Sequence, residues 1–161
     1  MKLTKYARDK TNPAVKGLMS MREILQSDWE RNYKKAGVSF EEAVESLGEQ
    51  IESGMKAAKL RNTILFYKIE DDGEALFHTV TADPYEVYMV LFMQLALGLH
   101  KAAGVDMLYT YVKDRTTHRM ASKIFKDFVD LEESDLEDTD KYKLTIYIAD
   151  FADAYSPKGV Q

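Results

Sequence analysis

Residues 74–112 constrain the fold of this chain more than any other segment. Glu74–Thr81 and Met107–Val112 are rich in β-branched and aromatic residues, whereas the stretch from Tyr85 to Leu99 between them is apolar on nearly every side of a helix. A strand, a helix and a strand at this spacing predict a βαβ unit with two parallel strands. Because the helix is so apolar, we expect it to be covered on most sides.

Both ends of this central helix are marked in the sequence. Asp83 stands where an N-cap is expected, Pro84 takes the first helical position, and Glu86 completes a capping-box spacing. Ala103-Gly104 stops the helix. The longest uncharged run, Val87–Leu99, has thirteen residues where a membrane span needs about twenty, so a membrane protein is excluded.

Two helices are expected before the βαβ unit. Apolar residues recur at helical spacing from about Leu18, and Ala36-Gly37 ends that pattern. Ser39 and Glu42 then have the spacing of a second capping box, and the helix that follows is predicted to run to about Lys59.

A hairpin leads into the unit, and a helix and a strand follow it. Thr63–Ile69 alternates like a strand and is joined to the next strand by Asp71-Asp72-Gly73, a hairpin turn signal. Beyond the unit we predict a helix over Thr117–Leu131, a last strand over Tyr142–Ile148 and a tail over residues 150–161.

Composition limits the class of protein. The 161 residues suit a single domain over 1–161, with residues 1–16 as an N-terminal arm or strand that holds five bases and one acid. With no cysteine, disulfides, thiolate metal sites and cysteine nucleophiles are all excluded. Because 27 acids outnumber 22 bases, we do not expect nucleic acid to be a partner.

The order of these elements resembles the GNAT acyltransferase fold, an α/β (α+β) fold with a mixed, mainly antiparallel sheet, one βαβ unit and about four helices. Ala121–Phe128 is similar to the segment that begins the family's fourth helix. The long apolar helix, Thr116-Thr117-His118 at the mouth of the next helix and the missing signature residues resemble, more narrowly, the degenerate GNAT-like internal virion proteins of short-tailed bacteriophages.

The cofactor loop of the family is altered in this sequence. The family holds the pyrophosphate of coenzyme A with a Gln/Arg-x-x-Gly-x-Gly/Ala loop before its third helix, whereas Thr79–Glu86 has no glycine and no arginine. Pro84 removes a donor N–H, Asp83 would occupy others and Glu86 adds negative charge, so we expect no cofactor. If the chain is active instead, the resemblance implies that acetyl-CoA contacts Thr81, Ala82, Asp83, Arg115 and Arg119.

The catalytic machinery of the family is also incomplete. Its general acid is commonly a tyrosine on the fourth helix, and Phe125, at the matching position, has no proton to give. We therefore predict no catalytic residue, and only Tyr109, Tyr111 and His118 remain as candidates. A packing role for the tyrosines and a capping or surface role for His118 stay open. The three histidines are isolated in the sequence, so no metal is expected.

Charge is distributed unevenly along the second half of the chain. Residues 113–126 hold five bases and one acid, whereas residues 127–140 hold eight acids and no base, so the helix predicted there is charged against its own dipole. Three interpretations of these charges stay open. They form a solvated surface, or they form a surface on which another protein or another copy docks, or Arg115 and Arg119 bind a phosphate. The candidates for partner binding are Arg115, Arg119, Lys123, Glu132, Glu133 and Asp135.

Two functions follow. The leading hypothesis is a bacteriophage virion-associated structural or assembly protein, made in the host cytoplasm, that acts through contacts with other virion proteins or copies of itself. The alternative is an active cytoplasmic N-acetyltransferase that transfers an acetyl group from acetyl-CoA to an amine.

Overall fold

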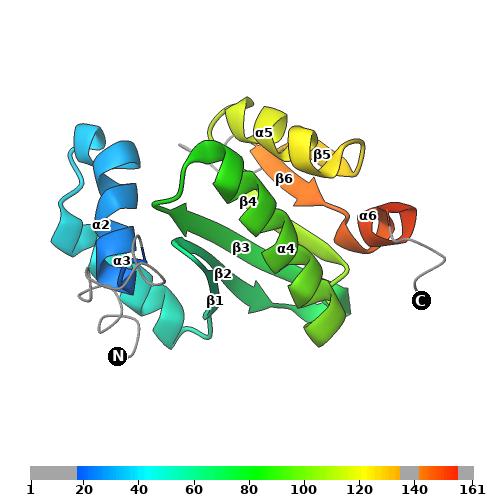
Figure 1. The fold of residues 1–161 in the computed structure, drawn as a ribbon, viewed down its shortest axis with the longest axis horizontal. Helices are drawn as coiled ribbons and strands as arrows, with labels where there is room; N and C mark the ends of the chain where they lie inside the picture. The colour runs from blue at the N-terminus through cyan, green and yellow to red at the C-terminus, as the bar shows by residue number, and fades with distance from the viewer. Residues whose placement is uncertain (1–17, 135–141, 156–161) are drawn as a thin grey trace. The chain divides into compact units, whose positions relative to one another are not determined.

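The computed structural model describes residues 18–134 and 142–155. Within them the helices are α2 (Met21–Asn32), α3 (Phe40–Glu52), α4 (Tyr85–Ala103), α5 (Thr116–Phe125) and α6 (Ile148–Tyr155), with short 3₁₀ turns over Lys34–Ala36 and Asp71–Gly73. The strands are β1 (Lys56–Leu60), β2 (Thr63–Ile69), β3 (Glu74–Thr81), β4 (Met107–Val112), β5 (Val129–Glu133) and β6 (Tyr142–Ile146). They form one mixed sheet in the order β1-β2-β3-β4-β6-β5, which confirms the predicted fold class (Figure 1).

The chain divides into two compact units, and β2, β3 and α4 each contribute to both. The first contains residues 1–66 and 79–91, and the second contains residues 67–78 and 92–161. Each unit is described separately below.

Helices α2 and α3 pack together in the first unit through an aromatic pair. The ring centroids of Trp29 and Phe40 are 5.8 Å apart, and the Trp29 indole N–H donates to the carbonyl of Val38 at 2.6 Å. A full capping box of Ser20 and Glu23 starts α2 and was not identified in the sequence. At α3, the Ser39 hydroxyl accepts from the Glu42 N–H, as predicted.

The prediction that the second helix reaches Lys59 is wrong. Helix α3 ends at Glu52, and Gly54, whose φ is +112°, turns the chain into β1. The alanines and lysines of β1 favour a helix, but main-chain pairing beside β2 overrides that propensity.

The second unit contains the parallel strand pair that the sequence predicted. Glu74 of β3 pairs in parallel with Met107 of β4, while β6 pairs antiparallel with both β4 and β5. Phe92 of α4 lies 5.5 Å, centroid to centroid, from both Phe77 of β3 and Phe125 of α5. These rings lie in the core of the unit.

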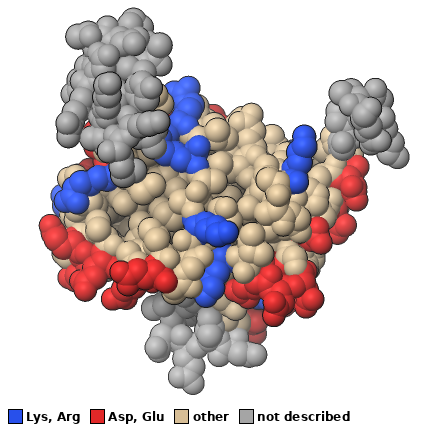
Figure 2. Space-filling model, turned by 90° about the horizontal axis from the view of Figure 1, so that it is seen from below, with Lys and Arg blue, Asp and Glu red and all other residues tan. Residues whose placement is uncertain are grey.

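The prediction of one helix over Thr117–Leu131 is wrong in its second half. Helix α5 ends at Phe125, Lys126 has a φ of +56°, and β5 then pairs with β6. The acidic residues after Phe125 therefore do not lie at the end of a helix, so the conflict with the helix dipole predicted there is absent. At the start of α5 the conflict remains, because Arg115 is the N-cap residue and the first turn has no acid. Figure 2 shows that acidic side chains gather in groups on the face it displays.

The last strand ends at Ile146, and the residues predicted to begin a tail form α6 instead. Ile148 and Phe151 are buried, and the Phe151 ring packs edge-on at 5.1 Å from Phe125. The i, i+3 spacing of these apolar residues was the helical signal that the sequence analysis missed.

Helix α4 is buried along one side and half-buried next to it, which agrees with the expectation that most of it is covered. Its buried residues are Tyr88, Leu91, Phe92, Leu95, Ala96 and Leu99. Val90 is 50% exposed, and Met89 and Met93 are half-buried. None of the helices in the described segments is long and apolar enough to cross a membrane.

Three predicted features lie outside the described residues. They are the basic arm over residues 1–16, the acidic stretch that includes Asp135, and the last six residues of the tail.

Candidate functional site

The turn between β3 and α4 is held by a buried polar network in the first unit. Asp83 is only 2% exposed, and its carboxylate accepts hydrogen bonds from the Asn62 N–H at 3.0 Å and from the Thr63 hydroxyl at 2.8 Å. The Asp83 N–H in turn donates to the Thr81 hydroxyl at 3.0 Å. A carboxylate with two donors satisfies the hydrogen-bonding rule for buried charges, so the turn is fixed in place.

Thr81 joins this network to helix α2. The Thr81 and Thr63 hydroxyls lie 2.7 Å apart, and the Thr81 N–H donates to the Asp28 carboxylate at 3.4 Å. Arg31 donates to the Thr81 carbonyl. Asp28 is 5% exposed on the same side of α2 as Ile24, four residues earlier, so its carboxylate is built into the packing of the unit.

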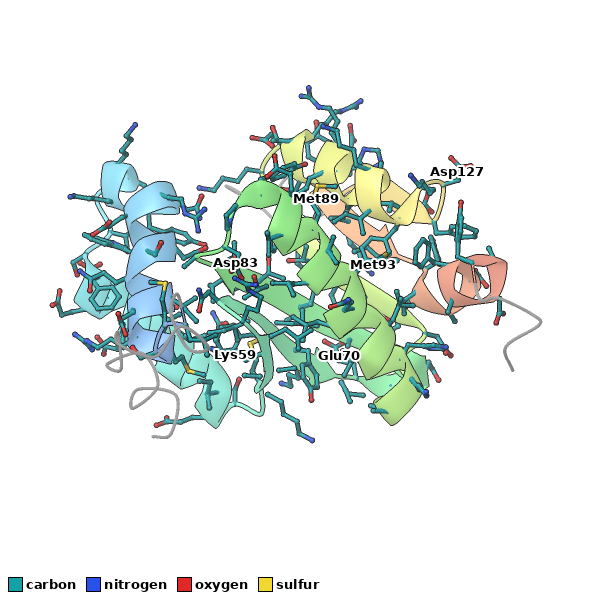
Figure 3. The ribbon with its side chains drawn as sticks, viewed as in Figure 1. Lys59, Glu70, Asp83, Met89, Met93 and Asp127 are labelled. Atoms are coloured by element: carbon teal, nitrogen blue, oxygen red, sulfur yellow. The ribbon has the colours of Figure 1, made fainter. Side chains whose placement is uncertain are left out.

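Two cations accompany Asp83. The Arg61 Nε lies 3.9 Å from the Asp83 carboxylate, and Lys59 donates to the Arg61 carbonyl. Burial lowers the pKa of Lys59, while the charge of Asp83 opposes that effect. Figure 3 labels both side chains. The buried carboxylate therefore has positive charge beside it.

Asp83 does not cap α4 as the sequence analysis expected. The Pro84 carbonyl accepts the first helical hydrogen bond, from the Tyr88 N–H at 2.8 Å, and α4 begins at Tyr85. Because the Asp83 carboxylate bonds to β2, it leaves the start of the helix open. Among the described residues, the N–H groups of Tyr85, Glu86 and Val87 make no hydrogen bond.

Tyr88 anchors the first turn of α4 to β3. Its hydroxyl lies 2.8 Å from the Thr79 hydroxyl, and burial raises the pKa of Tyr88 to about 12, with the hydrogen bond to Thr79 opposing and the charge of Asp28 adding to the shift. Below pH 10 both the folded and unfolded states keep the phenol neutral, so its contribution to stability is fully present there.

We therefore expect the unfolding free energy to fall by about 2–3 kcal/mol between about pH 10 and pH 12 on account of Tyr88, because only the unfolded state ionises there. Tyr88→Phe should remove this part of the pH dependence. Urea unfolding of the two proteins at several pH values measures it, with exposed Tyr85→Phe as the control. A constant difference between the protein and Tyr88→Phe over this range contradicts the expectation.

The candidate proton donors of the sequence analysis lie in the second unit. Tyr109 is 8% exposed, its hydroxyl donates to the Glu70 carboxylate, and the Lys143 ammonium lies 4.6 Å from its ring centroid. Burial, followed by the hydrogen bond and charge of Glu70, raises the pKa of Tyr109. Its proton is therefore strongly held, whereas Tyr111, half-buried beside it, has no such carboxylate among its described contacts.

His118 and the basic candidates are on or beside α5. His118 is half-buried in the first turn, and Arg119 and Lys123 are exposed. Arg115 precedes the helix, with its guanidinium 5.8 Å from the Tyr142 ring centroid. The Asp114 carboxylate accepts the Thr116 N–H at 2.8 Å, which lowers the pKa of Asp114. These residues belong to the second unit, whereas Thr81, Ala82 and Asp83 belong to the first.

The acidic partner candidates Glu132 and Glu133 are exposed on the edge strand β5. Phe125 is fully buried and serves packing.

Sequence reasoning missed four residues that hydrogen-bond to Thr81, Asp83 or Tyr109. Asn62 and Thr63 contact Asp83 across twenty or more residues, and Glu70 contacts Tyr109 across 39, so no local pattern reveals them. The burial of Asp28 could have been predicted from the sequence, because Asp28 follows apolar Ile24 by four residues and therefore lies on the same side of the helix.

Similarity to proteins of known structure agrees with the fold. No family model and no curated protein sequence matches the chain. A point mutant of the spermidine N-acetyltransferase SpeG from Vibrio cholerae has a TM-score of 0.52 at 12% identity, over 83% of this chain and 93% of that one. A chimera of that enzyme with hSSAT gives 0.54 at 12% identity, over 83% and 92%. A GNAT-family acetyltransferase from Bacillus anthracis gives 0.48 at 10% identity, over 80% and 86%.

The fold is thus that of the GNAT acetyltransferases, as the sequence resemblance implied. At 12% identity this likeness shows the fold alone, and activity has to be argued from the site.

Proposed function

We propose that this chain is a GNAT-type N-acetyltransferase that binds acetyl-CoA at the first turn of α4 and acetylates an amine. One observation carries the proposal: the N–H groups of Tyr85, Glu86 and Val87 are unoccupied, because the Asp83 carboxylate is held by β2. A free helix N-terminus with its dipole suits the pyrophosphate of the cofactor. The likeness to spermidine N-acetyltransferase over most of both chains supports the same reading.

Two features at the start of α4 favour the binding of an anion, and one feature weakens it. Pro84 precedes the helix, so its missing N–H leaves the three donors of the first turn intact. The Asp83 charge is turned away, with Arg61 beside it. Glu86, exposed in the first turn, adds a negative charge that weakens the attraction.

Acetyl-CoA supplies a thioester, from which the acetyl group passes to the amine as the carbon–sulfur bond breaks and the thiol is released. The chain must take up a proton from the amine and provide one to the departing thiolate. Phe125 cannot do this, and the Tyr109 proton is held by Glu70. Tyr111 and His118 therefore remain the candidates for proton transfer.

Calorimetric titration with acetyl-CoA and with CoA tests the proposal. We expect both to bind, and Glu86→Gln to tighten binding by about two- to fivefold, because it removes one negative charge beside the helix N-terminus. Glu30→Gln, which neutralises an exposed acid on α2, is the matched control and should leave affinity unchanged. Release of free thiol with spermidine as the acceptor then tests transfer.

Failure of both the protein and Glu86→Gln to bind either ligand would overturn the proposal. The second candidate function, a structural or assembly component of a bacteriophage virion, would then be favoured. It is supported by the composition of the β3–α4 turn, in which Asp83, Pro84 and Glu86 stand where the family has glycines that admit the pyrophosphate. In that case exposed Arg119, Lys123, Glu132 and Glu133 are the residues available for subunit contacts.

A further inference from the structure

The apolar stripe of α3 is only partly covered by the described residues. Phe40, at the start of the helix, is buried beneath Trp29. Further along, Val44 and Leu47 are half-buried, and Ile51 is 46% exposed. An amphipathic helix gains most of its stability from burial of its apolar side, and in the second half of α3 the described residues bury that side only in part.

Acidic residues of α3 itself border this stripe, while the Arg22 guanidinium lies 5.0 Å from the Phe40 ring centroid at its start. All five charged residues of α3 are exposed carboxylates: Glu41, Glu42, Glu45, Glu49 and Glu52. At 3.6 residues per turn they fall within a sector roughly 100° wide. Gly48 lies between that sector and the apolar stripe, with open space where a side chain would be.

The acidic residues at the end of α3 have no base in the same turn of the helix. Glu49 and Glu52 lie in the last turn, where the helix dipole is already negative, and no base is present in that turn. A cationic segment that covers this side of α3 is therefore favoured over a neutral or acidic one.

We propose that the N-terminal segment of the same chain, residues 1–17, docks on this side of α3. The segment holds apolar Leu3 and Tyr6 and five bases against one acid; the bases are Lys2, Lys5, Arg8, Lys10 and Lys16. Its composition thus matches both the apolar stripe and the acidic border.

Chain length allows this docking within one molecule. The segment joins the described chain at Leu18, just before α2, and α2 already packs on α3 through Trp29 and Phe40. Seventeen extended residues span up to about 56 Å, whereas the thirteen residues of α3 span about 20 Å. The segment therefore reaches all of α3 without a second copy.

Salt dependence should separate the two contributions to docking. Each exposed ion pair contributes little by itself and is screened over about 8 Å at physiological ionic strength. Burial of Leu47 and Ile51 adds an apolar contribution that salt does not screen. We therefore expect docking to weaken at high salt and on reversal of the segment's charges.

A single introduced thiol tests the proposal, because the chain has no cysteine. In the full chain carrying Ile51→Cys, alkylation by neutral iodoacetamide at low salt should be about fivefold slower than after the further changes Lys2→Glu, Lys5→Glu, Arg8→Glu and Lys10→Glu. In about 1 M salt the difference should shrink. Val90→Cys, at a position with similar exposure on α4, is the control and should show no such difference.

Two further measurements make the result decisive. Lys113→Glu and Lys123→Glu reverse exposed bases of the second unit, and should not change the alkylation rate at position 51. The slow rate should also be independent of protein concentration. Equal rates with and without reversal of the N-terminal charges would overturn the proposal, as would protection that grows with concentration, since the segment would then come from another copy.

Discussion

Phe125→Ala is expected to lower the unfolding free energy by about 3–5 kcal/mol, a loss typical of removing a buried aromatic ring. Phe125 is fully buried, and its ring packs edge-on against both Phe92 and Phe151. The substitution leaves a cavity at the centre of the second unit, between elements too rigid to close it completely. Urea unfolding followed by circular dichroism measures the loss.

Phe128→Ala is the matched control for this prediction. Phe128 also contacts Phe151 but is half-buried, so its removal should cost clearly less. Phe125→Tyr keeps the ring but buries a hydroxyl, at a cost of about 1–3 kcal/mol if no acceptor is found. Equal losses for Phe125→Ala and Phe128→Ala would contradict the assignment of Phe125 to the core.

Asp83→Ala is expected to cost about 2–4 kcal/mol, because the Asn62 N–H and the Thr63 hydroxyl would both lose a charged acceptor in a buried site. The Asp83 N–H and Thr81 would keep their hydrogen bond, so the turn should loosen rather than unfold. Thermal and urea unfolding measure the loss. If the proposed function is right, affinity for CoA should fall too, because the start of α4 is then less well positioned.

Glu86→Ala provides the comparison in the same turn. Glu86 is an exposed carboxylate three residues away, so its removal should change stability by no more than about 0.5 kcal/mol. Asp83→Asn keeps an oxygen acceptor, so its loss of unfolding free energy should lie between those of Asp83→Ala and Glu86→Ala. If Asp83→Ala proved as neutral as Glu86→Ala, the network at the turn would not be what holds the β3–α4 turn in place.

Local sequence patterns correctly predicted those strands whose residue composition favours a strand over a helix. The bounds of β2, β3 and β4 agree with the sequence prediction, because β-branched and aromatic residues alternate there between turn signals. Strands β1 and β5 were missed, since alanine, lysine and acidic residues favour other structures and only pairing with a neighbouring strand keeps them extended. Their conformation depends on contacts that a local window does not contain.

The candidate site, too, was predicted from the sequence only in part. The sequence located the β3–α4 turn and identified Asp83 as its characteristic residue, but assigned the carboxylate to the wrong partner. An aspartate before a helix is usually a cap. Here Thr63, the first residue of β2, and Asn62, just before it, donate to the carboxylate from about twenty residues earlier in the chain. Because the Asp83 carboxylate bonds to these residues, the N–H groups at the start of α4 stay open. The prediction about cofactor binding therefore depended on a long-range contact.

The packing of Trp29 has a practical consequence for studying this protein. It is the only tryptophan in the chain, and its indole is fixed between the Phe40 ring and the Val38 carbonyl in the first unit. Intrinsic fluorescence excited at the red edge of tyrosine absorption therefore reports on α2 and α3, while the tyrosine- and phenylalanine-rich second unit contributes little. Unfolding curves from fluorescence and from far-ultraviolet dichroism should coincide only if both units melt cooperatively.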